Sequence, residues 1–105
     1  MIQDRLRADL MQAMTDRDMA RARLLRTTLA ALENAEAVVG TDSSDGILGY
    51  GDVPRRTLTD DEMASIVTRE IEELGSSALE YRRVGHPDRA ETLERGIEIL
   101  RGYVS

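Results

Sequence analysis

The sequence contains no cysteine, lysine, tryptophan or phenylalanine, and its only histidine is His86. Because cysteine is missing, the chain has neither a disulfide framework nor a thiolate metal site, which is compatible with the cytoplasm. Nucleophilic catalysis needs an activated Ser, Cys, Thr or Lys beside a base. His86 stands between Gly85 and Pro87, where a helix cap or a solvated turn is expected. The sequence therefore predicts no catalytic residue, no metal site and no cofactor.

Long apolar runs are also absent. No uninterrupted stretch approaches the ~18 to 20 residues that a membrane-spanning helix needs. The start of the chain, MIQDRLRADL, is charged within four residues, which excludes a secretory signal peptide there. We therefore expect a cytoplasmic protein with no membrane partner.

Aromatic residues are few, and the sequence has only Tyr50, Tyr81 and Tyr103. Hydrophobic residues make up 41% of the chain, so a core is possible, but it must be aliphatic. This composition favours helices that pack closely together. A length of 105 residues suits a single small domain, residues 1–105.

Charge is distributed unevenly along the chain, and all fourteen basic residues are arginine. Residues 1–39 carry six Arg and six Asp or Glu, whereas residues 40–105 carry eight Arg and fourteen acids. The net charge of −6 therefore lies entirely in the second part. Such a surface gives no long-range attraction to polyanions, so DNA is not an expected partner.

The spacing of apolar residues predicts an all-α fold, a small antiparallel bundle of four helices. The expected helices are residues 2–15, 18–39, 59–84 and 87–104, with a flexible loop over 40–57. In the first helix, Leu6, Leu10 and Met14 recur every four residues on one face, with Ile2 and Met11 beside them.

Three local signals support these boundaries. The run TDRD at 15–18 offers residues that cap helices, as a turn followed by a new helix should. Thr59 and Glu62 have the spacing of a capping box at the start of the third helix. Gly85 and Pro87 are typical of a helix end and of the next helix start. Because both connections are short, neighbouring helices are expected to be antiparallel.

The glycine- and aspartate-rich segment 40–57 invites comparison with loops that bind phosphate or calcium. A P-loop follows a strand and contains Lys with Ser or Thr, whereas this segment follows a helix and has no lysine. A calcium loop starting at Asp42 would lack ligands at Ser44 and Gly46 and a glutamate at its twelfth position. The interpretation is a flexible connector between two helices.

The densest basic cluster lies at the start of the second helix, and a further arginine pair lies on the loop. At ~100° per residue the side chains of the cluster wrap around the helix and form no continuous stripe. No aromatic residue is close enough in sequence to stack on a base. Candidates for contacts with RNA or phosphate are Arg17, Arg21, Arg23 and Arg26, with Arg55 and Arg56 on the loop; surface ion pairs are the alternative.

Four segments together resemble the GatB/YqeY family: LRADLMQAMTDRD, LLRTTLAALENAEAV, IVTREIEE and SALEYRRVGHPDRAETLERGIEILRGYV. Their order and spacing carry the similarity, which covers most of residues 4–104 apart from the loop. The family includes small free-standing bacterial proteins and the C-terminal region of the B subunit of tRNA-dependent amidotransferases. Members usually continue past the final tyrosine into another small helical domain, whereas this sequence ends at Ser105.

The resemblance implies a cytoplasmic helical module linked to tRNA amidation. In the amidotransferase this tail helps to bind tRNA while glutamine-derived ammonia is used to amidate the aminoacyl group. The catalytic parts of that enzyme lie outside the shared region, so the resemblance places no catalytic residue here. It does carry a possible inherited label, a carbon–nitrogen ligase with glutamine as amido donor.

Three hypotheses follow. The first is a non-catalytic adaptor for tRNA or for a tRNA-handling protein. The second is a protein–protein interaction module with no role in RNA. The third is an enzyme with its own amidation activity, which the shortage of nucleophiles and bases disfavours. The oligomeric state is left open by the sequence.

Overall fold

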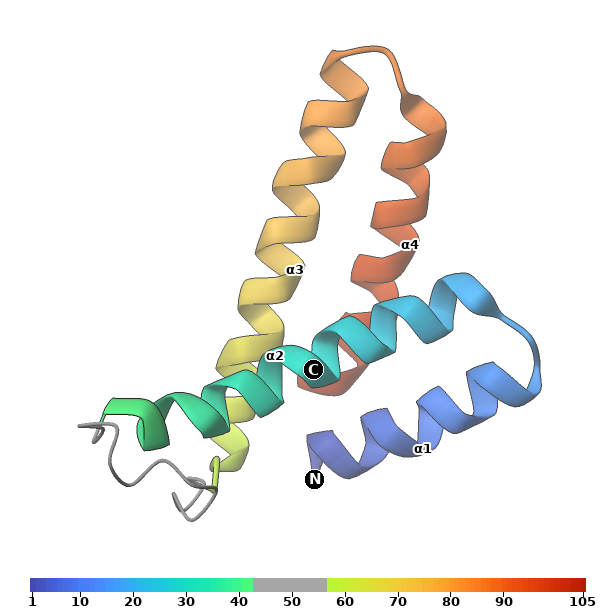
Figure 1. Ribbon diagram of the computed structural model, residues 1–105. Helices are drawn as coiled ribbons and strands as arrows, with labels where there is room; N and C mark the ends of the chain where they lie inside the picture. Colours follow the sequence, from blue (N-terminus) through green and yellow to red (C-terminus); the bar gives the residue numbers. More distant parts are fainter. Residues whose placement is uncertain (43–56) are drawn as a thin grey trace.

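The computed structural model describes residues 1–42 and 57–105, which form helices and no strand (Figure 1). The helices are α1 (Ile2–Thr15), α2 (Met19–Asp42), α3 (Asp60–Arg83) and α4 (Pro87–Val104). The prediction of an all-α helical bundle is confirmed for this part of the chain. None of the described helices combines the length and the apolarity that crossing a lipid bilayer requires.

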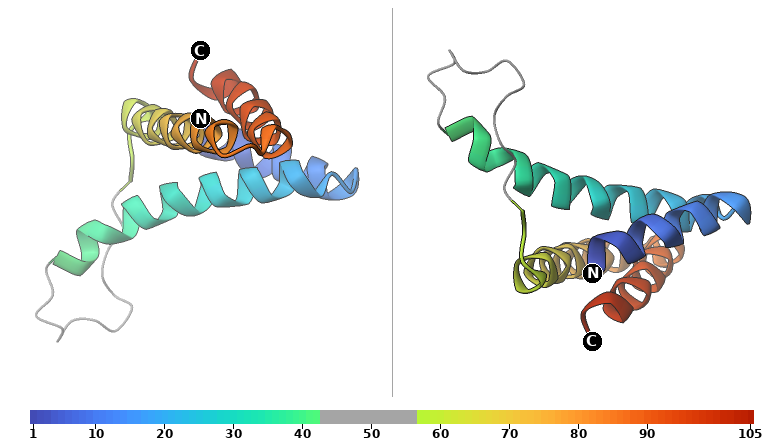
Figure 2. Two further views of the ribbon diagram at one scale, coloured as in Figure 1. Left: turned by 90° about the horizontal axis from the view of Figure 1, so that it is seen from above. Right: turned by 90° about the horizontal axis from the view of Figure 1, so that it is seen from below.

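The helices form two antiparallel hairpins that cross each other. Helix α1 packs against α2, and α3 packs against α4, while fewer contacts join the two pairs. Figure 1 shows α3 and α4 rising steeply away from α1 and α2, and both views in Figure 2 agree. The radius of gyration is 16.1 Å, above the ~13 Å expected for a compact domain of about 100 residues. The outer half of the α3–α4 hairpin therefore projects from the first pair.

Helix boundaries agree with the expected ones except at the end of α2. This helix continues to Asp42, three residues beyond the expected end at residue 39. Glycine inside a helix costs only about 1 kcal/mol relative to alanine, so Gly40 does not by itself end this helix. The rest of the expected flexible loop, residues 43–56, lies outside the described residues.

The expected signals at the ends of α3 are present. The Thr59 hydroxyl accepts a hydrogen bond from the Glu62 amide at 3.1 Å, and the Glu62 carboxylate accepts one from the Thr59 amide at 2.9 Å. This reciprocal pair confirms the predicted capping box. At the other end Gly85 takes a left-handed backbone with φ of 88°, and Pro87 opens α4. These signals fix the length of α3 and the tight turn to α4.

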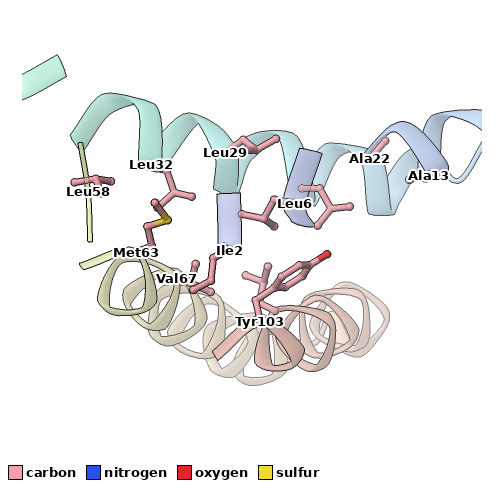
Figure 3. Packing of buried hydrophobic residues seen from close by; sticks show 12 residues of the cluster. Ile2, Leu6, Ala13, Ala22, Leu29, Leu32, Leu58, Met63, Val67 and Tyr103 are labelled. Atoms are coloured by element: carbon pink, nitrogen blue, oxygen red, sulfur yellow. The ribbon is translucent and has the colours of Figure 1, made fainter. Parts of the chain in front are cut away.

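The core lies where the hairpins meet (Figure 3). It is aliphatic apart from Tyr103, which comes from the last turn of α4 and is only 6% exposed. The cluster consists of Ile2, Leu6, Ala13, Ala22, Leu25, Leu29, Leu32, Leu58, Met63, Val67, Leu100 and Tyr103. The burial of Tyr103 differs from the expectation of a wholly aliphatic core.

One expectation about α1 is wrong. Leu6 is buried and Leu10 half-buried, as the four-residue spacing predicts, but Met11 and Met14 are 70% and 50% exposed. The physical reason is the crossing of the hairpins. In Figure 1 α3 and α4 meet the first hairpin away from its turn, so little covers the last turn of α1. The regular spacing of apolar residues along α1 therefore continues into its last turn, where the second hairpin covers little of the helix.

Close approach of three helices occurs at Gly96 on α4. A methyl group built at this glycine would lie 3.5 Å from both terminal carbons of Leu24 on α2 and 3.8 Å from Leu74 Cδ1 on α3. These are ordinary van der Waals distances, so a methyl group fits there and a larger side chain does not. Gly96 is thus a position where side-chain size limits how closely the hairpins cross.

We predict opposite effects for two substitutions at Gly96. Gly96→Ala should raise the free energy of unfolding by about 0.5–1 kcal/mol, because alanine is the better helix former and its methyl group fits. Gly96→Leu should lower it by about 1–3 kcal/mol through overpacking against Leu24 and Leu74. Urea unfolding followed by circular dichroism measures both. Equal stability of the two variants would contradict the close approach.

Candidate interaction surface at the turn between the first two helices

Helix α1 ends in a turn that places an arginine in a strained backbone conformation. The Arg17 amide donates to the Met14 carbonyl at 3.1 Å, and the Asp18 amide donates to the Ala13 carbonyl at 2.9 Å. This pair of bonds defines a Schellman motif, in which the residue after the C-cap is left-handed and usually glycine. Here that residue is Arg17, with φ of 58°. Arg17 therefore occupies a position that favours glycine.

The turn between α3 and α4 has the same hydrogen bonds around a glycine. The Gly85 amide donates to the Arg82 carbonyl at 3.3 Å, and the His86 amide donates to the Tyr81 carbonyl at 2.8 Å. Gly85 is the left-handed residue there. The chain thus uses glycine in one of two equivalent turns and Arg17 in the other. The backbone conformation of the turn therefore does not explain why an arginine stands at this position.

The two aspartates that flank Arg17 are engaged in the turn itself. Asp16 accepts a hydrogen bond from the Gln12 side-chain amide at 3.0 Å. Asp18 accepts one from the backbone amide of Arg21 at 3.2 Å and so caps the start of α2. Neither aspartate forms an ion pair with an arginine of the described ranges. Their carboxylates are held by these hydrogen bonds to neutral donors, so they form no ion pair but still offset part of the positive charge at the turn.

The arginine cluster predicted at the start of α2 is exposed, and within residues 1–42 and 57–105 its side chains form no ion pair. Arg26 Nη2 lies 3.9 Å from the Met14 sulfur. Elsewhere on the first hairpin Arg7 lies 3.9 Å from carboxylate oxygens of Asp4 and Glu33. On the other hairpin, four arginines are paired with carboxylates. These pairs are Arg82–Glu94 at 2.7 Å, Arg83–Glu80 at 2.9 Å, Arg95–Glu91 at 3.6 Å and Arg101–Glu98 at 2.9 Å. The last two join residues four and three positions apart, a spacing that places opposite charges side by side on a helix.

Three exposed methionines lie among these cations. Met11 and Met14 belong to the last turns of α1, and Met19, 58% exposed, opens α2. Ala13 of α1 and Ala22 of α2, both labelled in Figure 3, are buried in the same two helices. We call this region the corner surface: Met11, Met14, Arg17, Met19, Arg23 and Arg26. It combines apolar area with arginines that form no ion pair within the described residues.

Arg21 turns away from the corner surface toward the junction of the hairpins. There the Tyr103 hydroxyl donates a hydrogen bond to the Asp9 carboxylate, which joins the last helix to the first. The Arg5 guanidinium lies 4.9 Å from the centre of the Tyr103 ring and donates to the Gly102 carbonyl at 3.0 Å. We call Arg5, Asp9 and Tyr103 the polar clasp.

The clasp changes the proton affinity of its tyrosine. Burial, and then the hydrogen bond to Asp9 and its negative charge, raise the pKa of Tyr103 from 10.0 to about 12. The charge of Arg21 acts in the opposite direction and lowers this pKa. The sequence placed Arg21 near the apolar face of α2, and its influence on Tyr103 agrees with that position. Arg21 therefore acts at the hairpin junction as well as near the corner.

The other candidates do not form a second site. Arg55 and Arg56 lie outside the described residues. His86 is exposed, and its ring meets Tyr81 edge-on with centroids 6.3 Å apart. Across residues 1–42 and 57–105 no three potential metal ligands converge. The described depressions are shallow and follow α3, with Asp61 and Ser65 in both.

Comparison with known proteins adds one result. A family model described as Yqey-like protein matches residues 3–105, almost the full chain. No curated protein and no solved structure matches the chain in the corresponding searches. The family match agrees with the resemblance based on the four helical segments.

Arg17 supplies a prediction about stability. We expect Arg17→Gly to raise the free energy of unfolding by about 0.5–1 kcal/mol, because relief of the left-handed strain outweighs the greater freedom of glycine in the unfolded chain. Gly85→Arg, at the equivalent position, should have the opposite effect, since its surroundings have room for a side chain but its φ of 88° disfavours one. Thermal unfolding of both variants checks the pair. A loss of stability in Arg17→Gly would contradict the strain.

The clasp supplies a prediction about pH. Folding raises the pKa of Tyr103 from 10.0 to about 12, so the folded chain holds this proton more tightly than the unfolded chain. The resulting stabilisation is fully present below pH 10 and is lost as the pH rises from 10 through 12. Urea unfolding at several values in this range should show a decline that is smaller in Tyr103→Phe. The same decline in both proteins would contradict the role of Tyr103.

Proposed function

The chain belongs to the YqeY-like protein family, and from this premise we propose that it is a non-catalytic helical adaptor in tRNA handling. Its partner is tRNA itself or a protein that holds tRNA. The premise for tRNA is the similarity to the tail of the amidotransferase B subunit. The adaptor role requires a surface for an anionic partner, and the cations at the start of α2 supply one.

The observation that carries this proposal is the contrast between the arginines at the α1–α2 turn and four arginines of the other hairpin, where Arg69 and Arg89 also form no ion pair within the described residues. Four arginines near the α1–α2 turn lack ion pairs within the described residues, whereas those of α3 and α4 named above have carboxylates at 2.7–3.6 Å. An unpaired guanidinium binds phosphate or carboxylate oxygens without first breaking an internal pair. Residues 1–39 are neutral overall while residues 40–105 carry −6, so an anionic partner meets less repulsion at the first hairpin than elsewhere.

A second candidate function is a protein–protein module with no role in RNA. The exposure of Met11, Met14 and Met19 favours it, because methionine and arginine are enriched in protein interfaces whereas phosphate needs no apolar contact. Purification from cell extract with and without ribonuclease separates the two functions. A partner that stays bound after ribonuclease treatment, and that has no link to tRNA, supports the second.

Salt-titrated binding to tRNA tests the direct RNA version. We predict that replacing the cluster with glutamine (Arg17→Gln, Arg21→Gln, Arg23→Gln and Arg26→Gln) weakens binding about tenfold or more at ~0.1 M salt and flattens the salt dependence. Fewer phosphate contacts release fewer counterions, which is why the slope changes. Fluorescence anisotropy with labelled tRNA measures both quantities.

The matched control removes four paired arginines instead: Arg82→Gln, Arg83→Gln, Arg95→Gln and Arg101→Gln. Both variants change the net charge by the same amount, from −6 to −10. We expect the control to bind tRNA much better than the cluster variant, because local cations and not net charge determine the contact. Thermal unfolding verifies that both variants are folded. If the unmodified protein does not bind tRNA even at low salt, the proposal that it binds tRNA directly is wrong.

A further inference from the structure

The corner surface has an apolar component that an RNA backbone would leave unused. Met11, Met14 and Met19 are all at least half exposed, whereas the core methionine Met63 is 4% exposed. Methionine side chains adapt their shape to a partner and are common on surfaces that bind amphipathic helices. Three such side chains at one end of a hairpin are typical of a protein-binding surface.

The charges around these methionines indicate that the partner carries negative charge. Arg17, Arg23 and Arg26 form no ion pair in the described part of the chain, and Asp16 and Asp18 are used by the turn. Arg26 lies directly beside the Met14 sulfur, at 3.9 Å, so positive charge and apolar area are contiguous. A partner that fits here places apolar side chains on the methionines and carboxylates beside the arginines.

The form of the partner follows from what the fold offers. The described residues contain no strand, so they present no sheet edge to which an extended peptide could add. An extended segment lying on these methionines would therefore find no strand to pair with and would rely on water for its backbone groups. A helix satisfies its own backbone and presents apolar residues at spacings of three and four. To match the arginines, such a helix must also carry acidic residues beside its apolar face.

Arg17 gives independent support. It occupies a left-handed position for which the other turn uses Gly85, so an arginine there is at odds with the preference of the backbone. A contact between its guanidinium and a partner accounts for this choice. Arg17 would then lower the stability of the fold slightly and strengthen the binding of a partner.

We propose that the corner surface docks an acidic amphipathic helix of a partner protein. Apolar side chains of that helix pack on Met11, Met14 and Met19, and its carboxylates pair with Arg17, Arg23 and Arg26. The proposal rests on the proposed adaptor function. It states that the adaptor binds a partner protein, and not tRNA, at the corner surface. Two other occupants, tRNA and a second copy of this chain, are outcomes of the experiment below.

Site-specific photocrosslinking in cells that produce the protein identifies the occupant. A photoreactive amino acid replaces Met11 in the full chain, and a control chain carries it at Leu79, which is 71% exposed near the far end of α3. Mass spectrometry then reads the attached segment. We expect position 11 to capture a protein segment that is net acidic and has apolar residues three and four apart, and position 79 not to capture it.

Binding of that segment, made as a synthetic peptide, provides the quantitative test. We expect Arg17→Gly, Arg23→Gln and Arg26→Gln each to weaken binding about fivefold, while Arg95→Gln leaves it unchanged. Treatment with hydrogen peroxide should show Met11, Met14 and Met19 protected by the peptide, with Met1 reactive throughout. Because Arg17→Gly is expected to stabilise the protein, its weaker binding cannot be attributed to unfolding.

Several results would overturn the docking proposal: attachment of position 11 to nucleotides, to this chain itself or to a basic or neutral segment, or no attachment at all. Attachment to tRNA would contradict the docking of a partner helix but would leave the proposed adaptor function intact. Attachment to an acidic helix of a protein with no link to tRNA supports the docking and contradicts the tRNA role. The two ideas therefore fail in different ways.

Discussion

The hydrogen bond between Tyr103 and Asp9 joins the last turn of the chain to its first helix, and the arrangement of the hairpins depends on this junction. Each hairpin alone is a pair of helices with one apolar side, too small to bury a core. Tyr103 places an almost fully buried ring between them, and Arg5 fixes it from above the ring and through the Gly102 carbonyl. Burial and the Asp9 carboxylate both favour the protonated hydroxyl, so the clasp is stable at neutral pH.

The junction determines which surfaces are left open. Because α4 meets α1 along its first turns, the opposite end of the α1–α2 hairpin extends beyond the second hairpin (Figure 1). Apolar residues at that end, such as Met14, then have nothing to pack against. Arginines there form no ion pair within the described residues, whereas Arg82 of α3 pairs with Glu94 of α4 and Arg101 pairs with Glu98 within α4. The corner surface is therefore a consequence of how the hairpins cross, and it gives the adaptor proposal its location.

Much of the fold could be predicted from the sequence, because the signals involved are local. The Thr59–Glu62 capping box, the turn at Gly85 and the helix-spaced ion pair of Glu98 with Arg101 depend on residues within a few positions of each other. The crossing of the hairpins could not be predicted, since it depends on contacts such as Leu24 with Gly96, far apart in sequence. For the same reason the sequence indicated the arginine cluster but not the exposure of its methionine neighbours.

A double-mutant cycle between Asp9 and Tyr103 tests the central claim, that this contact holds the two hairpins together. Asp9→Ala, Tyr103→Phe and the double variant are compared with the unmodified protein by urea unfolding. A hydrogen bond to a carboxylate at a partly buried site predicts a coupling free energy of about 1 kcal/mol or more. Additive effects of the two substitutions would show that the contact contributes nothing, and the account of the junction would be wrong.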